Sequence, residues 1–161
     1  MRITDKYVFF YGSIYSQWYI RNMKIDNRIY NCCEQYMMHR KATMFDDWST
    51  ASRIMEAPHP GDQKDLGRQV QNFKKEEWDR VARDIVFQAN LVKFTQHSDL
   101  KEEMLSIGSR LFVEASPSDT IWGIGMDEND DLILDPANWK GTNWLGEALT
   151  RVKEYIQTGI R

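Results

Sequence analysis

A chain of 161 residues with 42% hydrophobic residues and six tryptophans can bury a core of its own, which excludes a disordered protein. A formal net charge of −3 argues against a protein that coats DNA or RNA, because such a protein needs a basic surface. No apolar run approaches the roughly 18 residues of a membrane span, and the adjacent Cys32 and Cys33 are expected to be free thiols. We therefore expect one cytoplasmic domain over residues 1–161.

The hydrophobic pattern predicts a helix-rich α+β domain with a small sheet. Residues 7–30 are predicted to form short strands and loops, because they are rich in aromatic residues and lack a helical period. A helix is expected from Asn31 to about Asp46, where apolar residues recur at three- and four-residue spacing. The Pro and Gly content of residues 57–67 predicts a loop there.

The second half of the chain carries the longest helical pattern, over residues 75–96. A shorter helix follows, with Ser98 as its expected cap and Gly108 as its end. "RLFVEA" is a predicted strand, and "DLILD" at 131–135 is a second candidate strand. The last helix is expected over 143–157, and its buried side would hold Leu145, Ala148, Leu149, Val152 and Ile156.

The helix predicted near residues 31–46 has two charges in its apolar sector. At 100° per residue, one side gathers Cys33, Met37, Met38, Ala42, Met44 and Phe45. The opposite, polar side gathers Gln35, Tyr36, His39, Arg40 and Thr43. Glu34 and Lys41 fall within the apolar side, seven residues and about 10 Å apart. Either both reach solvent or outside partners, or they line a polar pocket and hold opposite ends of one ligand.

Two other basic residues, Lys93 and Arg68, lie near the edges of predicted elements. Lys93 lies at the margin of an apolar stripe, and we expect its long side chain to extend to solvent. "DLGRQV" places Gly67 and Arg68 where a loop is expected to change into a helix. Arg68 there would bind a phosphate or form a surface ion pair.

Two Gly- and Trp-containing segments are candidate binding elements. In "WKGTNWLG", Trp139, Gly141 and Asn143 precede the last helix. Backbone amides there would bind an anion or a sugar hydroxyl, or the segment would simply be a cap anchored by its indoles. In "EASPSDTIWGIG", residues 114–125, a turn requires Pro, Asp and Gly but has no evident need for Trp122.

Several common motifs are absent from the sequence. "GIG" lacks the lysine of a phosphate-binding loop. The acidic run at 127–138 lacks the central glycine and final glutamate of a calcium loop. The three histidines and two cysteines show no metal-ligand spacing. What remains is an acid/base site without a metal.

Four segments in order, "CCEQYMMHRKA", "LGRQV", "EASPSDTIWGIG" and "WKGTNWLGEAL", closely resemble the NADAR family, also called YbiA-like. The resemblance extends from about Tyr7 to Tyr155. The family's opening segment, of the Ser-Pro-Leu-Ser-Asn-Phe-Tyr type, is altered here to "SIYSQWY". Ser13 in this altered segment is a candidate substrate contact.

The resemblance implies a YbiA-like α+β fold and N-glycosidase activity on a ribosyl group, without a cofactor. The family's glutamate, lysine, aspartate and tryptophan match Glu34, Lys41, Asp119 and Trp122, so the first three are expected to be catalytic. The expected substrate-binding residues are Trp122, Arg68, Ser13, Trp139, Gly141 and Asn143. The substrate classes that the resemblance implies are ADP-ribosylated guanine and phosphoribosylated intermediates of riboflavin biosynthesis. We expect no membrane and no obligate protein partner.

The chemistry of glycoside cleavage suggests a role for each catalytic residue. Asp119 would stabilise positive charge on the ribose or act as a base, and Glu34 would bind sugar hydroxyls or relay protons. Lys41 would donate a proton to the leaving base, or would attack the sugar as a neutral amine and form an imine. Two alternatives remain: a sensor that binds ADP-ribose or a related nucleotide without cleaving it, and a structural protein in which Glu34 and Lys41 are merely solvated.

Overall fold

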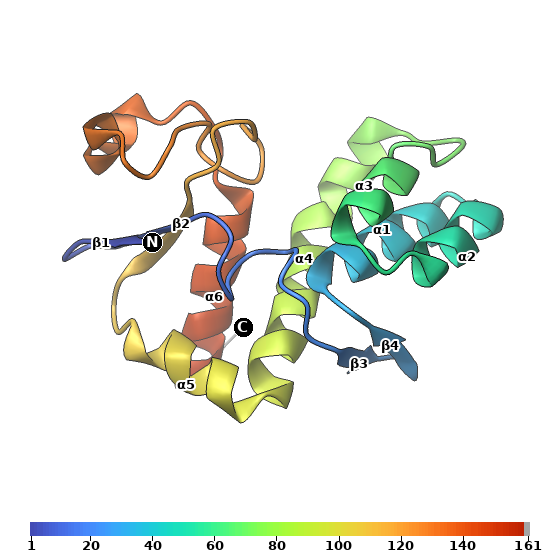
Figure 1. The fold of residues 1–161 in the computed structure, drawn as a ribbon, viewed down its shortest axis with the longest axis horizontal. Coiled ribbons are helices and arrows are strands. Elements are labelled where there is room, and N and C mark those ends of the chain that lie inside the picture. The colour runs from blue at the N-terminus through green and yellow to red at the C-terminus, as the bar shows by residue number, and fades with distance from the viewer. Residues whose placement is uncertain (160–161) are drawn as a thin grey trace. The chain divides into compact units, whose positions relative to one another are not determined.

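The structure, a computed structural model, describes residues 1–159 and is shown in Figure 1. Its contacts divide the chain into two compact units. The continuous unit is Gln17–Gln96, and the split unit combines Met1–Ser16 with the chain from His97 onward. A single domain over residues 1–161 stays a prediction. Within residues 1–159, no helix combines the length and the apolar character needed to cross a membrane.

The continuous unit begins with a hairpin and continues with four helices. Strands β3 (Met23–Ile25) and β4 (Arg28–Tyr30) pair antiparallel. Asp26 and Asn27 join them at positive φ, as a tight hairpin turn requires. The helices are α1 (Cys33–Met44), α2 (Trp48–Glu56), α3 (Pro60–Gly67) and α4 (Lys75–Gln96). Helix α1 packs against the other three, and Figure 1 shows α2 and α3 lying beside it.

Helix α1 is buried on more sides than its sequence predicts. Gln35, Tyr36 and His39, which were expected on a polar side, are buried. The Gln35 side chain donates to the carbonyl of Ile54 at 3.1 Å and accepts from the backbone of Asn31 at 2.8 Å. The side opposite the apolar one is therefore buried as well at these three residues, because neighbouring elements supply partners for their polar atoms.

Two short helices pack on α1 where the sequence predicts no helix. In α2, Asp47 caps the first turn by accepting from the backbone N–H of Thr50 at 3.1 Å. The loop predicted at 57–67 is wrong, because α3 occupies residues Pro60–Gly67. Pro60 suits the first turn of a helix, where its missing N–H costs nothing. Gly67 packs against Met38 so closely that a Cβ would overlap the Met38 sulfur.

Among residues 1–159, the split unit holds a three-stranded sheet and two α-helices. The sheet order is β1 (Arg2–Ile3), β2 (Tyr7–Phe10), β5 (Leu111–Glu114), and β2 and β5 are parallel with Phe9 beside Val113. The helices are α5 (Ser98–Ser106) and α6 (Trp144–Thr158), as predicted, although Ser98 is the first residue of α5 rather than its cap. Helix α6 packs against β5.

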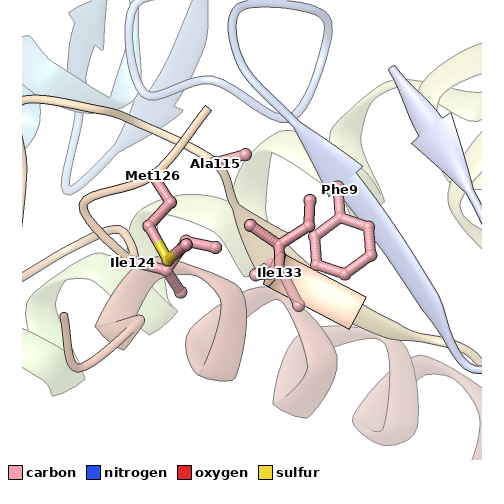
Figure 2. Close-up of a cluster of buried hydrophobic side chains, with 6 residues drawn as sticks. Phe9, Ala115, Ile124, Met126 and Ile133 are labelled. Atoms are coloured by element: carbon pink, nitrogen blue, oxygen red, sulfur yellow. The ribbon is translucent and has the colours of Figure 1, made fainter. Parts of the chain in front are cut away.

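The core of the split unit explains why "DLILD" is not a strand. Figure 2 shows Ile133 packed with Phe9, Ala115, Ile124 and Met126, all buried. The segment forms two 3₁₀ turns, η1 (Asp131–Leu134) and η2 (Pro136–Asn138). Asp130 and Asp135 each accept a backbone N–H two residues further on, at 2.9 and 3.0 Å. These side-chain bonds favour tight turns over an extended strand, so the strand prediction was wrong.

The surroundings of His39 indicate that acid lowers the stability of the continuous unit. Arg28 can only donate, so its contact with His39 Nε2 at 3.0 Å requires a neutral imidazole, whose Nδ1 then donates to the Tyr30 hydroxyl at 3.1 Å. Burial first, then Arg28 and Arg40, lower the pKa of His39. The unfolded chain therefore takes up this proton first, and the free energy of unfolding falls as the pH drops below about 6.5.

Urea unfolding of wild type and His39→Gln at several pH values between about 7.5 and 5.5 tests this expectation. The difference in free energy of unfolding between the two proteins should shrink or reverse as the pH falls, since glutamine takes up no proton. The exposed His59, changed to Gln, is the matched control and should behave as wild type. A constant difference across the pH range would contradict a neutral, buried His39.

Candidate functional site

Glu34 and Lys41 lie in the first and last turns of α1. Glu34 is 7% exposed and Lys41 is half-buried. The backbone N–H of Glu34 donates to the carbonyl of Gln17 at 3.0 Å, which fixes the start of the helix. The interpretation that both side chains simply reach into solvent was therefore wrong for Glu34. We call these two residues the α1 pair.

The surroundings of Lys41 lower the pKa of its amine. Its Nζ lies 4.5 Å from the centre of the Phe73 ring. Burial lowers the pKa of Lys41, Glu34 raises it in part, and Arg68 lowers it again. A larger fraction of this amine is consequently unprotonated near neutral pH than in an exposed lysine. Phe73 was not identified from the sequence, because it lies outside every predicted element.

Arg68 is positioned by the end of α3 rather than by the start of a helix. It is the residue that follows the last turn of α3, and its backbone N–H donates to the carbonyl of Lys64 at 3.1 Å. Its guanidinium lies 3.7 Å from Asp65, with both side chains about two-thirds exposed (68% and 66%). An exposed pair of this kind contributes at most about 1 kcal/mol, so a phosphate can compete for the guanidinium.

The bend at 116–125 is organised by the Asp119 carboxylate. Its Oδ1 accepts from the backbone N–H groups of Ile121 and Trp122 at 2.9 and 2.8 Å. Across residues 1–159, no hydrogen bond to its other oxygen, Oδ2, is found. Asp119 thus has a structural role through one oxygen while the second remains available. The Trp122 ring packs edge-on against Trp144, with centres 5.5 Å apart.

The segment "WKGTNWLG" is bound to this bend through its own backbone. The N–H groups of residues 142–145 donate to carbonyls of residues 120–123 at 2.9–3.1 Å. These four amides are therefore occupied by carbonyls of the bend, which favours the alternative that the segment is a cap. Gly141 allows the close approach, since a Cβ there would overlap the carbonyl of Gly123.

The Asn143 and Trp139 side chains are also engaged within the split unit. Asn143 accepts from the backbone of Glu114 at 2.9 Å and donates to the carbonyl of Phe112 at 3.1 Å, which joins the start of α6 to β5. Trp139 donates to the carbonyl of Ile133 at 2.8 Å. These contacts give both residues a structural role. Substrate binding by Trp139, Gly141 and Asn143 stays a prediction.

Ser13 lies in an exposed turn of the split unit. Its φ is 55°, and its Oγ accepts from the backbone N–H of Tyr15 at 3.3 Å. The hydroxyl stabilises the turn, and a role in substrate binding stays a prediction.

Lys93 departs most from its sequence interpretation. Its side chain is 1% exposed, so the expectation that it extends to solvent was wrong. Its Nζ lies 5.2 Å from the Tyr19 ring centre and 5.1 Å from that of Phe94. Burial lowers the pKa of Lys93, and the neighbouring Cys33 opposes that effect. The residue lies in the same stripe as other buried positions of α4, a signal that pointed to burial.

The structure thus gathers the predicted residues into two sets. Glu34, Lys41 and Arg68 lie in the continuous unit, whereas the split unit contains Ser13, Asp119, Trp122, Trp139, Gly141 and Asn143. Among the described residues, no group of three or more His, Cys, Asp or Glu side chains could hold a metal ion.

Comparison with known proteins gives related sequences over nearly the whole chain. A family model described as the NADAR domain matches residues 9–157. N-glycosidase R617 of Acanthamoeba polyphaga mimivirus is 40% identical over 167 residues, which cover 96% of this chain and 98% of that protein. N-glycosidase Npun_R5314 of Nostoc punctiforme is 34% identical, and the match covers 77% of this chain and 72% of that protein.

A solved structure shares the fold. The NMR structure of the E. coli protein YbiA superposes with a TM-score of 0.79 and covers 98% of this chain and 89% of that chain, at 23% sequence identity. The predicted α+β fold of the YbiA-like type is confirmed.

The pKa of Lys41 should respond to its two charged neighbours in opposite directions. Arg68→Gln removes a like charge and should raise the pKa of Lys41, whereas Glu34→Gln removes an opposite charge and should lower it further. NMR titration of the dimethylated lysines, with Lys41 assigned through Lys41→Arg, measures both shifts. Arg53→Gln, on α2, is the control. Shifts of the same sign in both variants would contradict the described surroundings.

Proposed function

The chain belongs to the NADAR domain family, and we propose that it is an N-glycosidase that hydrolyses the bond between a ribosyl group and a nitrogenous base. The α1 pair is the observation that carries the proposal. A buried carboxylate and a half-buried lysine with a lowered pKa share one helix face, which suits proton transfer better than a solvated surface would. The names of the relatives support the same class of reaction.

Breaking an N-glycosidic bond places positive charge on the ribose and negative charge on the departing base. Asp119 supplies a fixed carboxylate whose Oδ2 stabilises the first charge or removes a proton from water. Glu34 binds sugar hydroxyls or relays protons. Water adds to the anomeric carbon, and the base leaves with a proton. No cofactor is required by these steps.

Lys41 has two chemically distinct roles available to it. As an acid, its ammonium protonates the leaving base. As a nucleophile, its neutral amine bonds to the anomeric carbon while the bond to the base breaks, and one amine proton goes to the base. The bond between the anomeric carbon and the ring oxygen then breaks, the ring oxygen takes the second amine proton, and water hydrolyses the resulting imine to release the sugar and the free amine. The lowered pKa of Lys41 supports the second role, because an imine requires a neutral amine.

The substrate is proposed to be a ribosyl nucleotide, either ADP-ribosylated guanine or a phosphoribosylated intermediate of riboflavin biosynthesis. Trp122 would stack on the base or close the site, and Arg68 would bind a phosphate. The exposed guanidinium of Arg68 supports the phosphate role, since only a weak surface pair with Asp65 would have to be displaced.

Asp119→Asn is the sharpest test of the proposed chemistry. Asparagine keeps an oxygen for the two backbone N–H groups of the bend but loses the negative charge. We expect turnover to fall by about 100-fold or more while the thermal stability stays near that of wild type. Asp119→Ala should lose turnover and also about 1–2 kcal/mol of stability, because two backbone donors lose their partner.

The assay is mass spectrometry of released base and sugar from an ADP-ribosyl-guanine oligonucleotide, NAD and phosphoribosylated pyrimidine amines. Asp130→Asn is the matched control, since Asp130 makes a similar cap without a proposed catalytic role. Full turnover by Asp119→Asn would sink the assigned role. Binding without release of product by wild type would make the protein a sensor.

Borohydride trapping separates the two roles of Lys41. Reduction of an imine leaves a stable secondary amine, so wild type treated during turnover should gain the mass of the reduced sugar on the peptide that contains Lys41. Lys41→Arg should gain none. An active wild-type enzyme that shows no adduct would leave Lys41 as a proton donor.

A further inference from the structure

An indole and two cations border α3 next to the α1 pair, and the function proposed above uses only one of them. Trp18 is 46% exposed, and it follows Gln17, whose carbonyl accepts from the Glu34 backbone. The Lys64 Nζ lies 5.9 Å from the centre of the Trp18 ring. All of these residues belong to the continuous unit.

Glycine at position 61 brings this ring close to α3. A Cβ built on Gly61 would lie 3.8 Å from the edge of the Trp18 ring, which is ordinary van der Waals contact. The first turn of α3 therefore runs close to one edge of the indole, and nearly half of the residue's surface remains open to solvent. An indole held in this way offers a preformed surface on which a planar group can stack.

The geometry of α3 places two cations on the side of the helix that carries Gly61, next to Trp18. At 100° per residue, Lys64 and Arg68 lie within about 60° of Gly61. The buried side of α3 carries Gln63 and Gly67, and Lys64 lies about 60° from Gly67, which contacts Met38 of α1. Of the two acids of α3, Asp62 projects about 100° away from Gly61. Asp65 takes part only in the weak pair with Arg68.

The charge of Lys64 is not neutralised by a neighbour. Among the described residues, Lys64 forms no ion pair, and its one described polar contact is with the Trp18 ring. A cation–π pair at an exposed site is weaker than a direct hydrogen bond between an ammonium and a phosphate. A phosphate beside the indole would therefore draw the ammonium away from the ring and open the ring face for stacking.

We propose that Trp18, Lys64 and Arg68 form a second binding subsite, for the nucleoside diphosphate part of a substrate whose ribosyl bond is cleaved at the α1 pair. The base of this nucleoside, which is not the base that leaves, stacks on Trp18. The diphosphate contacts the Lys64 ammonium and the Arg68 guanidinium. This inference rests on the proposed function, and it favours a substrate with a diphosphate and a second nucleoside over a simple phosphoribosyl compound.

The test is a binding measurement, so it does not depend on turnover. Isothermal titration with ADP-ribose and with ribose 5-phosphate compares a ligand that fills the subsite with one that lacks the adenosine and one phosphate. Wild type should prefer ADP-ribose. Trp18→Leu should weaken ADP-ribose binding about tenfold, the loss of one stacking contact, and leave ribose 5-phosphate binding within about twofold. Lys64→Gln should weaken ADP-ribose binding about threefold or more.

Three control variants distinguish loss of the subsite from a general effect of substitution on folding. Trp18→Phe keeps a ring for stacking and should retain most of the affinity. Trp48→Leu removes the more exposed indole of α2, which is 60% exposed, and Lys75→Gln removes a cation of α4. Both should bind ADP-ribose as wild type does.

Equal affinity for ADP-ribose in wild type, Trp18→Leu and Lys64→Gln would overturn the subsite. So would a wild type that binds ADP-ribose no better than ribose 5-phosphate. The two proposals can fail separately. If wild type releases no base, and ADP-ribose affinity falls in Trp18→Leu but not in Trp48→Leu, the result would refute the proposed glycosidase activity and support the subsite.

Discussion

The burial of α1 on nearly every side is the constraint on which the candidate site depends. A helix surrounded in this way can carry polar residues only if each finds a partner or has a use, because an unsatisfied buried group costs about 1–3 kcal/mol. Gln35 meets this requirement through the backbone of Asn31 and Ile54, and His39 through Tyr30 and Arg28. The same packing desolvates Lys41 and thereby lowers the pKa of its amine.

In the split unit, the carboxylate of Asp119 has both a structural role and a proposed catalytic role. Asp119 ties the bend together through Oδ1, and the backbone of residues 142–145 holds the bend from the other side. The geometry of Oδ2 is thus set by bonds that need no substrate, which is how a preorganised charge is built. Trp122, part of the same bend, packs against Trp144 and is positioned by the same bonds.

The sequence predicted the elements whose signal is local and missed those that depend on neighbours. Helix α4 begins and ends where its periodicity predicts. Helix α3 was predicted as a loop because Pro60, Gly61 and Gly67 disfavour helices, yet Pro60 suits a first turn and Gly67 allows contact with Met38. The spacing of Glu34 and Lys41 was readable from the sequence. The contact between Lys64 and Trp18 was not readable, since it depends on tertiary packing.

The most direct test of the account is the rate of base release by three variants of α1. Lys41→Met and Glu34→Gln remove the α1 pair one group at a time, and Arg40→Met removes a cation from the exposed position beside Lys41. With the substrate that wild type cleaves, the account predicts a loss of about 100-fold or more for Lys41→Met, a clear loss for Glu34→Gln, and little change for Arg40→Met. Wild-type rates in both Lys41→Met and Glu34→Gln would contradict it.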